Sequence, residues 1–138
     1  MKDSYVPMRN IFILKPNTWF DLGTVKVRLE ELEHDTPNYC LKAEIKGKKL
    51  IYIVDTANVD NIKAKDYDLF LIEANYNELT LKEHINMCEN PDELYYLYRV
   101  PTTHLSYQDA NSFLIENMNK NSIYEYIHKS DYNFKEEE

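Results

Sequence analysis

The chain has 138 residues, of which 43% are hydrophobic and 13% aromatic, with 2 glycines and 5 prolines. This composition predicts one ordered domain with a sizeable core, and it excludes a disordered or loop-dominated chain. The 16 basic and 24 acidic residues give a net charge of -8. That charge argues against general nucleic-acid binding and favours a basic protein partner.

The sequence predicts a single domain over residues 1–138, with a polar lead-in at 1–9 and an acidic tail at 131–138. Cys40 and Cys88 are too few for a disulfide framework, and no CxxC motif occurs. No signal-like or membrane-length apolar run is present either, so we expect a cytoplasmic protein.

Short strands are predicted for the first part of the chain. Residues 10–15 are a short apolar run, and residues 24–33 alternate between apolar and polar side chains as a half-buried strand does. A loop at 34–38 follows, because Pro37 disfavours helix at the residue before it. Residues 39–45 alternate again, and a turn at 46–49 leads into the next strand, which predicts a hairpin.

Two buried strands, 50–54 and 69–72, form the centre of the predicted fold. Both are apolar on each face and rich in β-branched residues, which is typical of strands inside a sheet. Each ends in a carboxylate, Asp55 after the first and Glu73 after the second. We therefore expect these two acids to be neighbours at one rim of the sheet, where loops carry chemistry.

Helices dominate the prediction after residue 76. A helix is expected at 78–88, ended by Asn90-Pro91, whereas residues 95–98 fit no pattern clearly. Residues 101–105 are expected to lead as a loop into Ser106, whose hydroxyl can cap a helix with Asp109 in a variant of the capping box. One face of that helix carries Ala110, Phe113, Leu114 and Met118. A last strand is predicted at 123–127, and it stops at His128.

Three histidines and two acids fall at the ends of predicted elements: His34, His104 and His128 with Asp55 and Glu73. Imidazole and carboxylate groups at such loops are the ligands that zinc or a similar divalent ion uses. The alternative for each histidine is an ordinary surface or hydrogen-bonded loop residue. His84 falls inside a predicted helix and is left out of the set.

Five segments in order resemble the second half of the metallo-β-lactamase fold. Their sequences are EHD (33–35), YIVDTA (52–57), DLFLIEANY (68–76), RVPTTHLSYQDA (99–110) and YIHKSDYN (126–133). The likeness is to small hydrolase-like proteins of phages of low-GC bacteria and their YycJ-type and ribonuclease Z-type relatives. It implies an α/β (α+β) fold: half of an αββα sandwich, with a mostly antiparallel or mixed sheet and two or three helices on one face.

The resemblance also implies roles for the five residues. His34, Asp55 and His128 match metal ligands, with Asp55 in the bridging position. Glu73 and His104 match a catalytic pair in which the glutamate orients a histidine that donates a proton to the leaving group.

One motif of the resembled family is missing from this sequence. The first half of that fold carries His-x-His-x-Asp-His, which supplies four ligands, and no such pattern occurs here. We therefore expect one ion at most, held by His34, Asp55 and His128 with a water or a partner ligand. Zinc is the first expectation and manganese the alternative, while hydrogen bonds without an ion would equally account for these residues.

Resemblance, size and charge together favour a catalytically incomplete, phage-type metal-binding protein. It would bind and block a basic host protein, as an anti-CRISPR protein blocks a nucleic-acid-guided nuclease. A second interpretation is a phosphodiesterase or nuclease whose missing ligands come from a dimer mate or second chain, and a third is a structural or accessory remnant. The sheet face left bare by the missing half predicts either a homodimer or a tight complex with a host protein.

Overall fold

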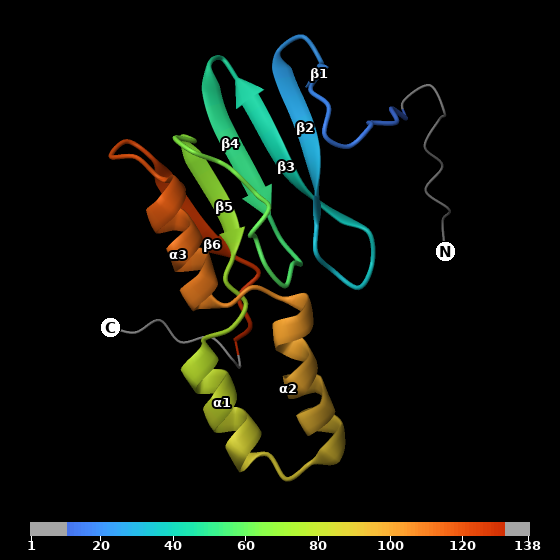
Figure 1. Ribbon diagram of the computed structural model, residues 1–138, viewed down its shortest axis with the longest axis vertical. Coiled ribbons are helices and arrows are strands. Elements are labelled where there is room, and N and C mark those ends of the chain that lie inside the picture. Colours follow the sequence, from blue (N-terminus) through green and yellow to red (C-terminus); the bar gives the residue numbers. More distant parts are fainter. Residues whose placement is uncertain (1–10, 132–138) are drawn as a thin grey trace.

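Six strands and three helices make up the computed structural model, which describes residues 11–131 (Figure 1). The predicted lead-in at 1–9 and all of the predicted tail beyond residue 131 lie outside the described residues. The strands are β1 (Phe20–Asp21), β2 (Val25–Leu32), β3 (Asn38–Ile45), β4 (Lys48–Ile53), β5 (Leu69–Glu73) and β6 (Ile123–Ile127). The helices are α1 (Glu78–Met87), α2 (Pro91–Thr103) and α3 (Tyr107–Asn117).

The strands form one mixed sheet in the order β1-β2-β3-β4-β5-β6. Strands β1 to β4 pair antiparallel through tight connections, including the predicted hairpin between β3 and β4. Strands β4, β5 and β6 run parallel. Parallel strands end at the same edge, so Asp55 and Glu73 lie at one rim, as the sequence predicted, and His128 joins them there.

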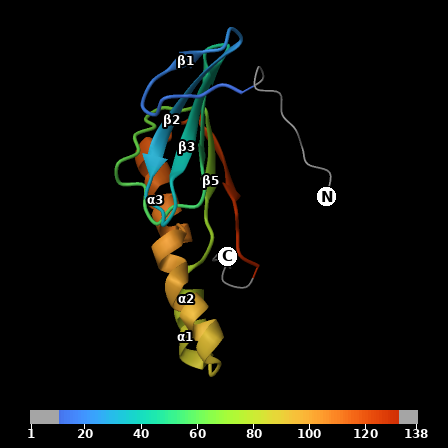
Figure 2. The ribbon, with the colours of Figure 1, turned by 90° about the vertical axis from the view of Figure 1, so that its right-hand side faces the viewer.

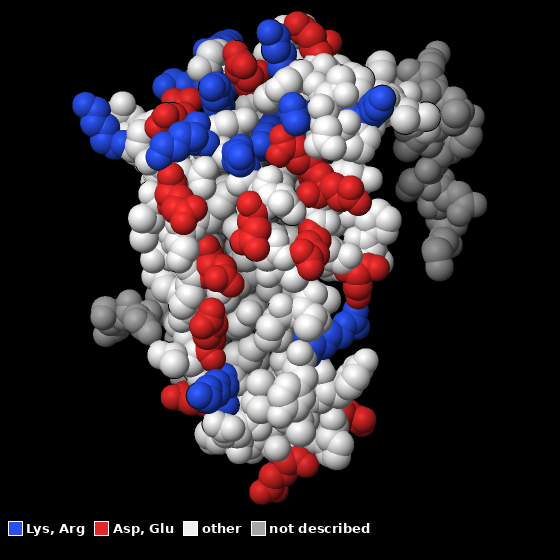
Figure 3. Space-filling model, viewed as in Figure 1, with Lys and Arg blue, Asp and Glu red and all other residues white. Residues whose placement is uncertain are grey.

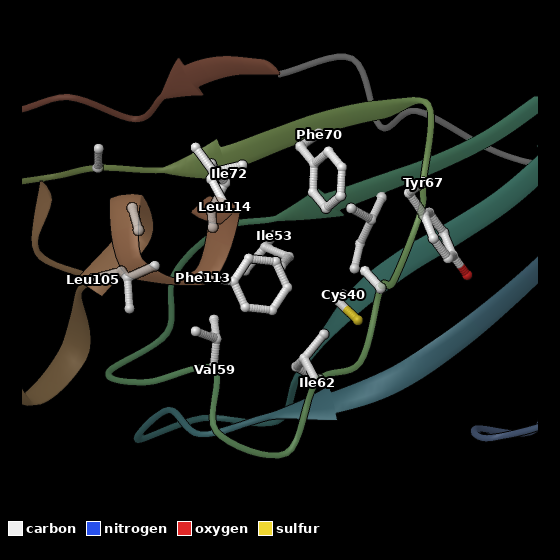
Figure 4. Packing of buried hydrophobic residues seen from close by; sticks show 14 of the residues in the cluster. Cys40, Ile53, Val59, Ile62, Tyr67, Phe70, Ile72, Leu105, Phe113 and Leu114 are labelled. Carbon is white, nitrogen blue, oxygen red and sulfur yellow. The ribbon is translucent and has the colours of Figure 1, made fainter. Parts of the chain in front are cut away.

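The main core lies between the sheet and α3 (Figure 4). Phe70 of β5 and Phe113 of α3 are in edge contact, with ring centroids 6.3 Å apart. Val59 and Ile62, from the segment between β4 and β5, close the same core. Ala110, Phe113 and Leu114 are buried on α3 as predicted, and Met118 packs against the core from the helix C-cap.

Helices α1 and α2 form a hairpin that extends beyond the end of the sheet, whereas α3 lies on one sheet face (Figures 1 and 2). The hairpin has a small core of its own, formed by Tyr76, Leu81, Leu97 and Val100. None of these three helices is long and apolar enough to cross a membrane.

Two predicted elements are wrong. Residues 11–15 form no strand, because this segment has no ladder partner and Pro16 follows it. Residues 101–103, predicted as loop, are the last turn of α2 despite Pro101. Asn90-Pro91 ends α1 but also starts α2, since the Asn90 side chain caps it and Pro91 occupies its first turn. Pro101 lies close enough to the helix end to remove little of the hydrogen bonding.

Candidate metal centre

Four side chains from separate parts of the chain converge at the rim where β4, β5 and β6 end. They are Asp55 after β4, Glu73 at the end of β5, His104 at the C-cap of α2, and His128 after β6. Each offers one ligand atom, and these atoms all lie within 4.8 Å of one another. The sheet topology therefore gathers two carboxylates and two imidazoles at one point.

Glu73 is the buried centre of this cluster, with no exposed surface. Its Oε1 lies 2.6 Å from Nδ1 of His104 and 2.8 Å from Nδ1 of His128. Its Oε2 accepts the backbone N–H groups of Thr56 at 3.1 Å and Leu105 at 3.4 Å. A buried carboxylate is tolerated only with such donors or a positive charge beside it, and Glu73 has donors at both oxygens.

Asp55 and His128 both adopt left-handed backbone conformations, with φ angles of 54° and 55°. This region is unfavourable for residues other than glycine by about 1 kcal/mol, so surrounding contacts must hold it. The Asn38 side-chain amide supplies such contacts, donating to the carbonyls of Val54 at 2.7 Å and Asp55 at 2.6 Å. For His128, the side chain of Asn75 donates to the backbone carbonyl at 2.9 Å.

The Asp55 carboxylate faces both histidines. Its Oδ1 lies 3.1 Å from Nδ1 of His128 and 3.6 Å from Nδ1 of His104. The Asp55 and His128 side chains keep 44% and 42% of their surface exposed. Since Glu73 is fully buried beneath them, the cluster is closed at its base and open to solvent at the top.

His104 is held by the end of α2, where its backbone N–H donates to the carbonyl of Val100 at 3.0 Å. The hydrogen bond to Glu73 raises the pKa of His104 above its ordinary value, although partial burial opposes the shift. The hydrogen bond therefore favours the charged imidazole of His104 over the neutral one.

His34 lies outside this group of four. Its Nδ1 is 3.1 Å from Oγ1 of Thr36 and 2.7 Å from Oδ1 of Asp35, within the loop between β2 and β3. It shares with His104 and Arg99 the wall of a cavity of about 260 Å³, and Arg99 forms an ion pair with Asp35. The metal-ligand role of His34 stays a prediction.

The donor set fits a divalent ion. Zinc takes imidazole nitrogen and carboxylate oxygen at roughly 2.0–2.2 Å, and a tetrahedral site then separates neighbouring ligand atoms by about 3.3 Å. The Asp55 contacts, at 3.1 and 3.6 Å, already match that spacing. The Glu73 contacts, at 2.6 and 2.8 Å, are hydrogen bonds that would lengthen by about 0.5–0.7 Å to admit an ion.

Sequence reasoning paired Glu73 with His104, and these two residues are indeed hydrogen bonded. It missed that Glu73 also contacts His128, at 2.8 Å. The only local signal was that the last predicted strand stops at His128. The contact itself depends on β6 lying beside β5, which is a long-range pairing that no local pattern reveals.

Comparisons with known proteins identify the fold. No protein-family model matches this sequence, and no curated protein matches it. The structure is similar to the metallo-β-lactamase fold protein YhfI from Bacillus subtilis, with a TM-score of 0.54 and 13% sequence identity. The match covers 75% of this chain but 36% of that chain. The predicted fold class is thus confirmed: an α+β structure that corresponds to part of a metallo-β-lactamase fold.

Proposed function

We propose that this chain is a metal-binding protein that holds one divalent ion, zinc by preference, between Asp55, Glu73, His104 and His128. The convergence of these four ligand atoms within 4.8 Å around a fully buried carboxylate carries the proposal. In the metal-free state, protons on the imidazole nitrogens hold the cluster together. The ion replaces them, because ligating imidazoles must be neutral.

Metal analysis tests this function directly. Protein stripped with a chelator and reloaded with excess zinc or manganese, then desalted, should retain about one ion per chain, since one cluster offers four ligands. Asp55→Ala and His128→Ala should weaken the affinity measured by calorimetry at least 100-fold, whereas His84→Ala, on α1, is the matched control and should bind normally. Wild-type protein that retains no ion would refute the proposal.

The same measurement on His34→Ala decides the ligand role predicted for that residue. With the four-residue cluster as the complete site, His34→Ala binds zinc like the wild type. A loss comparable to that of Asp55→Ala would instead place His34 among the ligands, after a movement of the loop between β2 and β3.

Beyond metal binding, we propose that the protein is an inhibitor. The metal stabilises a domain that binds and blocks a basic, nucleic-acid-guided nuclease of a host defence system. The net charge of -8 supports it, because such nucleases carry positive channels for nucleic acid. Acidic side chains spread over much of the face that α3 covers, while Lys and Arg gather near the β3–β4 turn (Figure 3).

Purified components test the inhibitory role. Added to a guide-loaded nuclease, the protein should reduce DNA cleavage in proportion to its molar ratio, and more so at low salt because the attraction is electrostatic. Cleavage that continues unchanged at a tenfold excess, across representative nuclease classes, would reject this role without affecting the metal-binding proposal.

A second candidate is hydrolysis of a phosphodiester, with further ligands supplied by another chain. The hydrogen bond of 2.6 Å between Glu73 and His104 favours it, since a proton-donating histidine needs such an orienting carboxylate. The metal-loaded protein should then hydrolyse bis-p-nitrophenyl phosphate. Absence of hydrolysis, or hydrolysis that persists in His104→Ala at saturating metal, would exclude this candidate.

A further inference from the structure

A cavity of about 600 Å³ lies on the α3 side of the sheet, over β2 and β3. Lys42 places it on that side, because it shares one face of β3 with Cys40, which belongs to the core beneath α3. The rest of the lining comes from residues 17–19 and from residues 61–67, between β4 and β5. None of the four residues of the metal cluster lines this cavity. Its volume is typical of a small-molecule site, for which the range is roughly 300–1,000 Å³.

Two cations in this lining share a single carboxylate. Arg28 and Lys42 are directly opposite each other in the register of β2 and β3, a position in which like charges destabilise a sheet. Glu30 pairs with both: its Oε1 lies 2.8 Å from Nε of Arg28, and its Oε2 accepts from Nζ of Lys42 at 2.6 Å. The Lys42 side chain is only 6% exposed, so solvent screens its charge poorly.

Hydrogen-bond donors remain over after this pairing. The Nη groups of Arg28 have no hydrogen-bond partner within the described part of the chain, and Lys42 uses two of its three N–H groups, on Glu30 and on the carbonyl of Lys63 at 2.7 Å. Lys63 is a third cation of the lining, whereas Glu31 belongs to the opposite face of β2 by strand alternation. Three cations against one carboxylate leave this cavity short of an anion, although the net charge of the chain is -8.

An aromatic side chain stands beside these cations. Trp19 is 42% exposed and lines the cavity. Its segment is anchored to β2, because the backbone N–H of Asn17 donates to the carbonyl of Leu29 at 2.7 Å and β1 pairs with β2 directly after Trp19. Tyr67 adds a second ring to the lining, and its hydroxyl points away from the packed core cluster (Figure 4). An accessible indole face favours the stacking of a planar ring.

We infer that this cavity binds a small aromatic anion, a planar ring that carries one phosphate or carboxylate group. The ring stacks on Trp19, and the anionic group accepts from the guanidinium of Arg28 and from Lys42. Arginine suits this role because its planar fork of N–H groups matches both carboxylate and phosphate oxygens. The ligand supplies the second anion that the Arg28–Lys42 pair lacks. The inference does not depend on the proposed metal binding.

Tryptophan fluorescence tests this site directly, because Trp19 is the single tryptophan of the chain. Metal-free, full-length protein is titrated with AMP, a ring with a phosphate, and with benzoate, a ring with a carboxylate. At least one of them should change the fluorescence with half-saturation at about 1 mM or below. Adenosine, which lacks the anion, and inorganic phosphate, which lacks the ring, should bind at least tenfold more weakly.

Two substitutions separate the contributions of charge and ring. Arg28→Gln removes the guanidinium but keeps the pair of Lys42 with Glu30, and it should weaken binding at least tenfold. Its matched control, Lys26→Gln, loses the same charge two residues earlier on the same face of β2, outside the lining, and should bind like the wild type. Trp19→Leu, followed by calorimetry, should also weaken binding at least tenfold. Circular dichroism checks that each variant is folded.

Three results would overturn the inference. The first is the absence of saturable binding of both AMP and benzoate up to about 10 mM. The second is adenosine or inorganic phosphate binding as tightly as the better of the two ligands. The third is binding that survives both Arg28→Gln and Trp19→Leu. Zinc affinity should be unchanged in Arg28→Gln, which separates this result from the outcome of the metal experiments.

Discussion

Glu73 holds the candidate site together through hydrogen bonds at both of its carboxylate oxygens. Because the side chain is fully buried, its carboxylate depends on the hydrogen-bond donors at both of its oxygens. His104 and His128 each place Nδ1 within hydrogen-bond distance of Glu73, and a divalent ion would take the place of the protons on these nitrogens. The site therefore exchanges protons for metal, and its stability and its affinity depend on pH in opposite directions.

The first prediction concerns this dependence in the metal-free protein. The pKa of His104 is raised in the folded state by its hydrogen bond to Glu73. A raised folded pKa contributes stability that is fully present below the unfolded pKa of about 6.5 and is lost as pH rises through the folded value. His104→Gln should thus lower the free energy of unfolding more at pH 5.5 than at pH 9.

Urea unfolding measures this difference. It is carried out on the wild type and on His104→Gln, at both pH values and in the presence of a chelator. His84→Gln, on α1 and outside the cluster, is the control for a histidine-to-glutamine substitution as such. If the destabilisation by His104→Gln were equal at pH 5.5 and pH 9, the ion pair with Glu73 would contribute nothing.

At the level of elements, local patterns predicted the sheet well. Alternation identified β2 and β3, and the two buried runs identified β4 and β5 with their acids at one rim. The cap at Ser106 was also correct, since its hydroxyl accepts the N–H of Asp109 at 3.0 Å. These features depend on neighbours in sequence, which is why periodicity and capping chemistry reveal them.

The errors arose where contacts distant in sequence decide the structure. Residues 95–103 belong to α2 because Leu97 and Val100 pack against Leu81 of α1, and this contact outweighs the effect of Pro101. For the same reason, the sequence predicted only part of the site. Asp55 and Glu73 follow from two adjacent strands, whereas the contact of His128 with Glu73 requires the pairing of β5 with β6.

The second prediction concerns how β3 supports the site. Asn38, the first residue of β3, holds the backbone of Val54 and Asp55 by two hydrogen bonds of 2.7 and 2.6 Å. Asn38→Ala leaves both carbonyls without this donor and releases Asp55 from its left-handed conformation. We expect a loss of stability of about 1–2 kcal/mol and a zinc affinity lowered roughly tenfold.

Denaturant unfolding and zinc calorimetry on the same preparation measure both effects of Asn38→Ala. Asn119→Ala is the control: that side chain accepts only the N–H of Asn121, far from the site, and its loss should leave zinc affinity unchanged. An Asn38→Ala protein that binds zinc as tightly as the wild type would show that Asp55 holds its position without Asn38.

At the scale of the whole molecule, the metal cluster joins parts of the chain that are far apart in sequence. The chain corresponds to about a third of a metallo-β-lactamase fold protein, and its sheet carries apolar side chains on both faces. An ion would cross-link the ends of three strands and the end of α2. The first and last of its ligands, Asp55 and His128, are more than 70 residues apart in sequence.

The third prediction follows from this cross-linking. A ligand that binds only the folded state stabilises it by about 2.7 kcal/mol at a concentration 100 times its dissociation constant. For a chain of this size, that corresponds to a rise in Tm of roughly 10 °C. Zinc should therefore raise Tm by this amount at pH 7.5, and by less at pH 5.5, because protons then compete for the two imidazoles.

Differential scanning fluorimetry across a zinc titration measures the shift. Asp55→Ala should show none, and His84→Ala should respond like the wild type. A wild-type Tm that stays constant across the titration, or an equal rise in Asp55→Ala, would contradict stabilisation by an ion bound at this cluster.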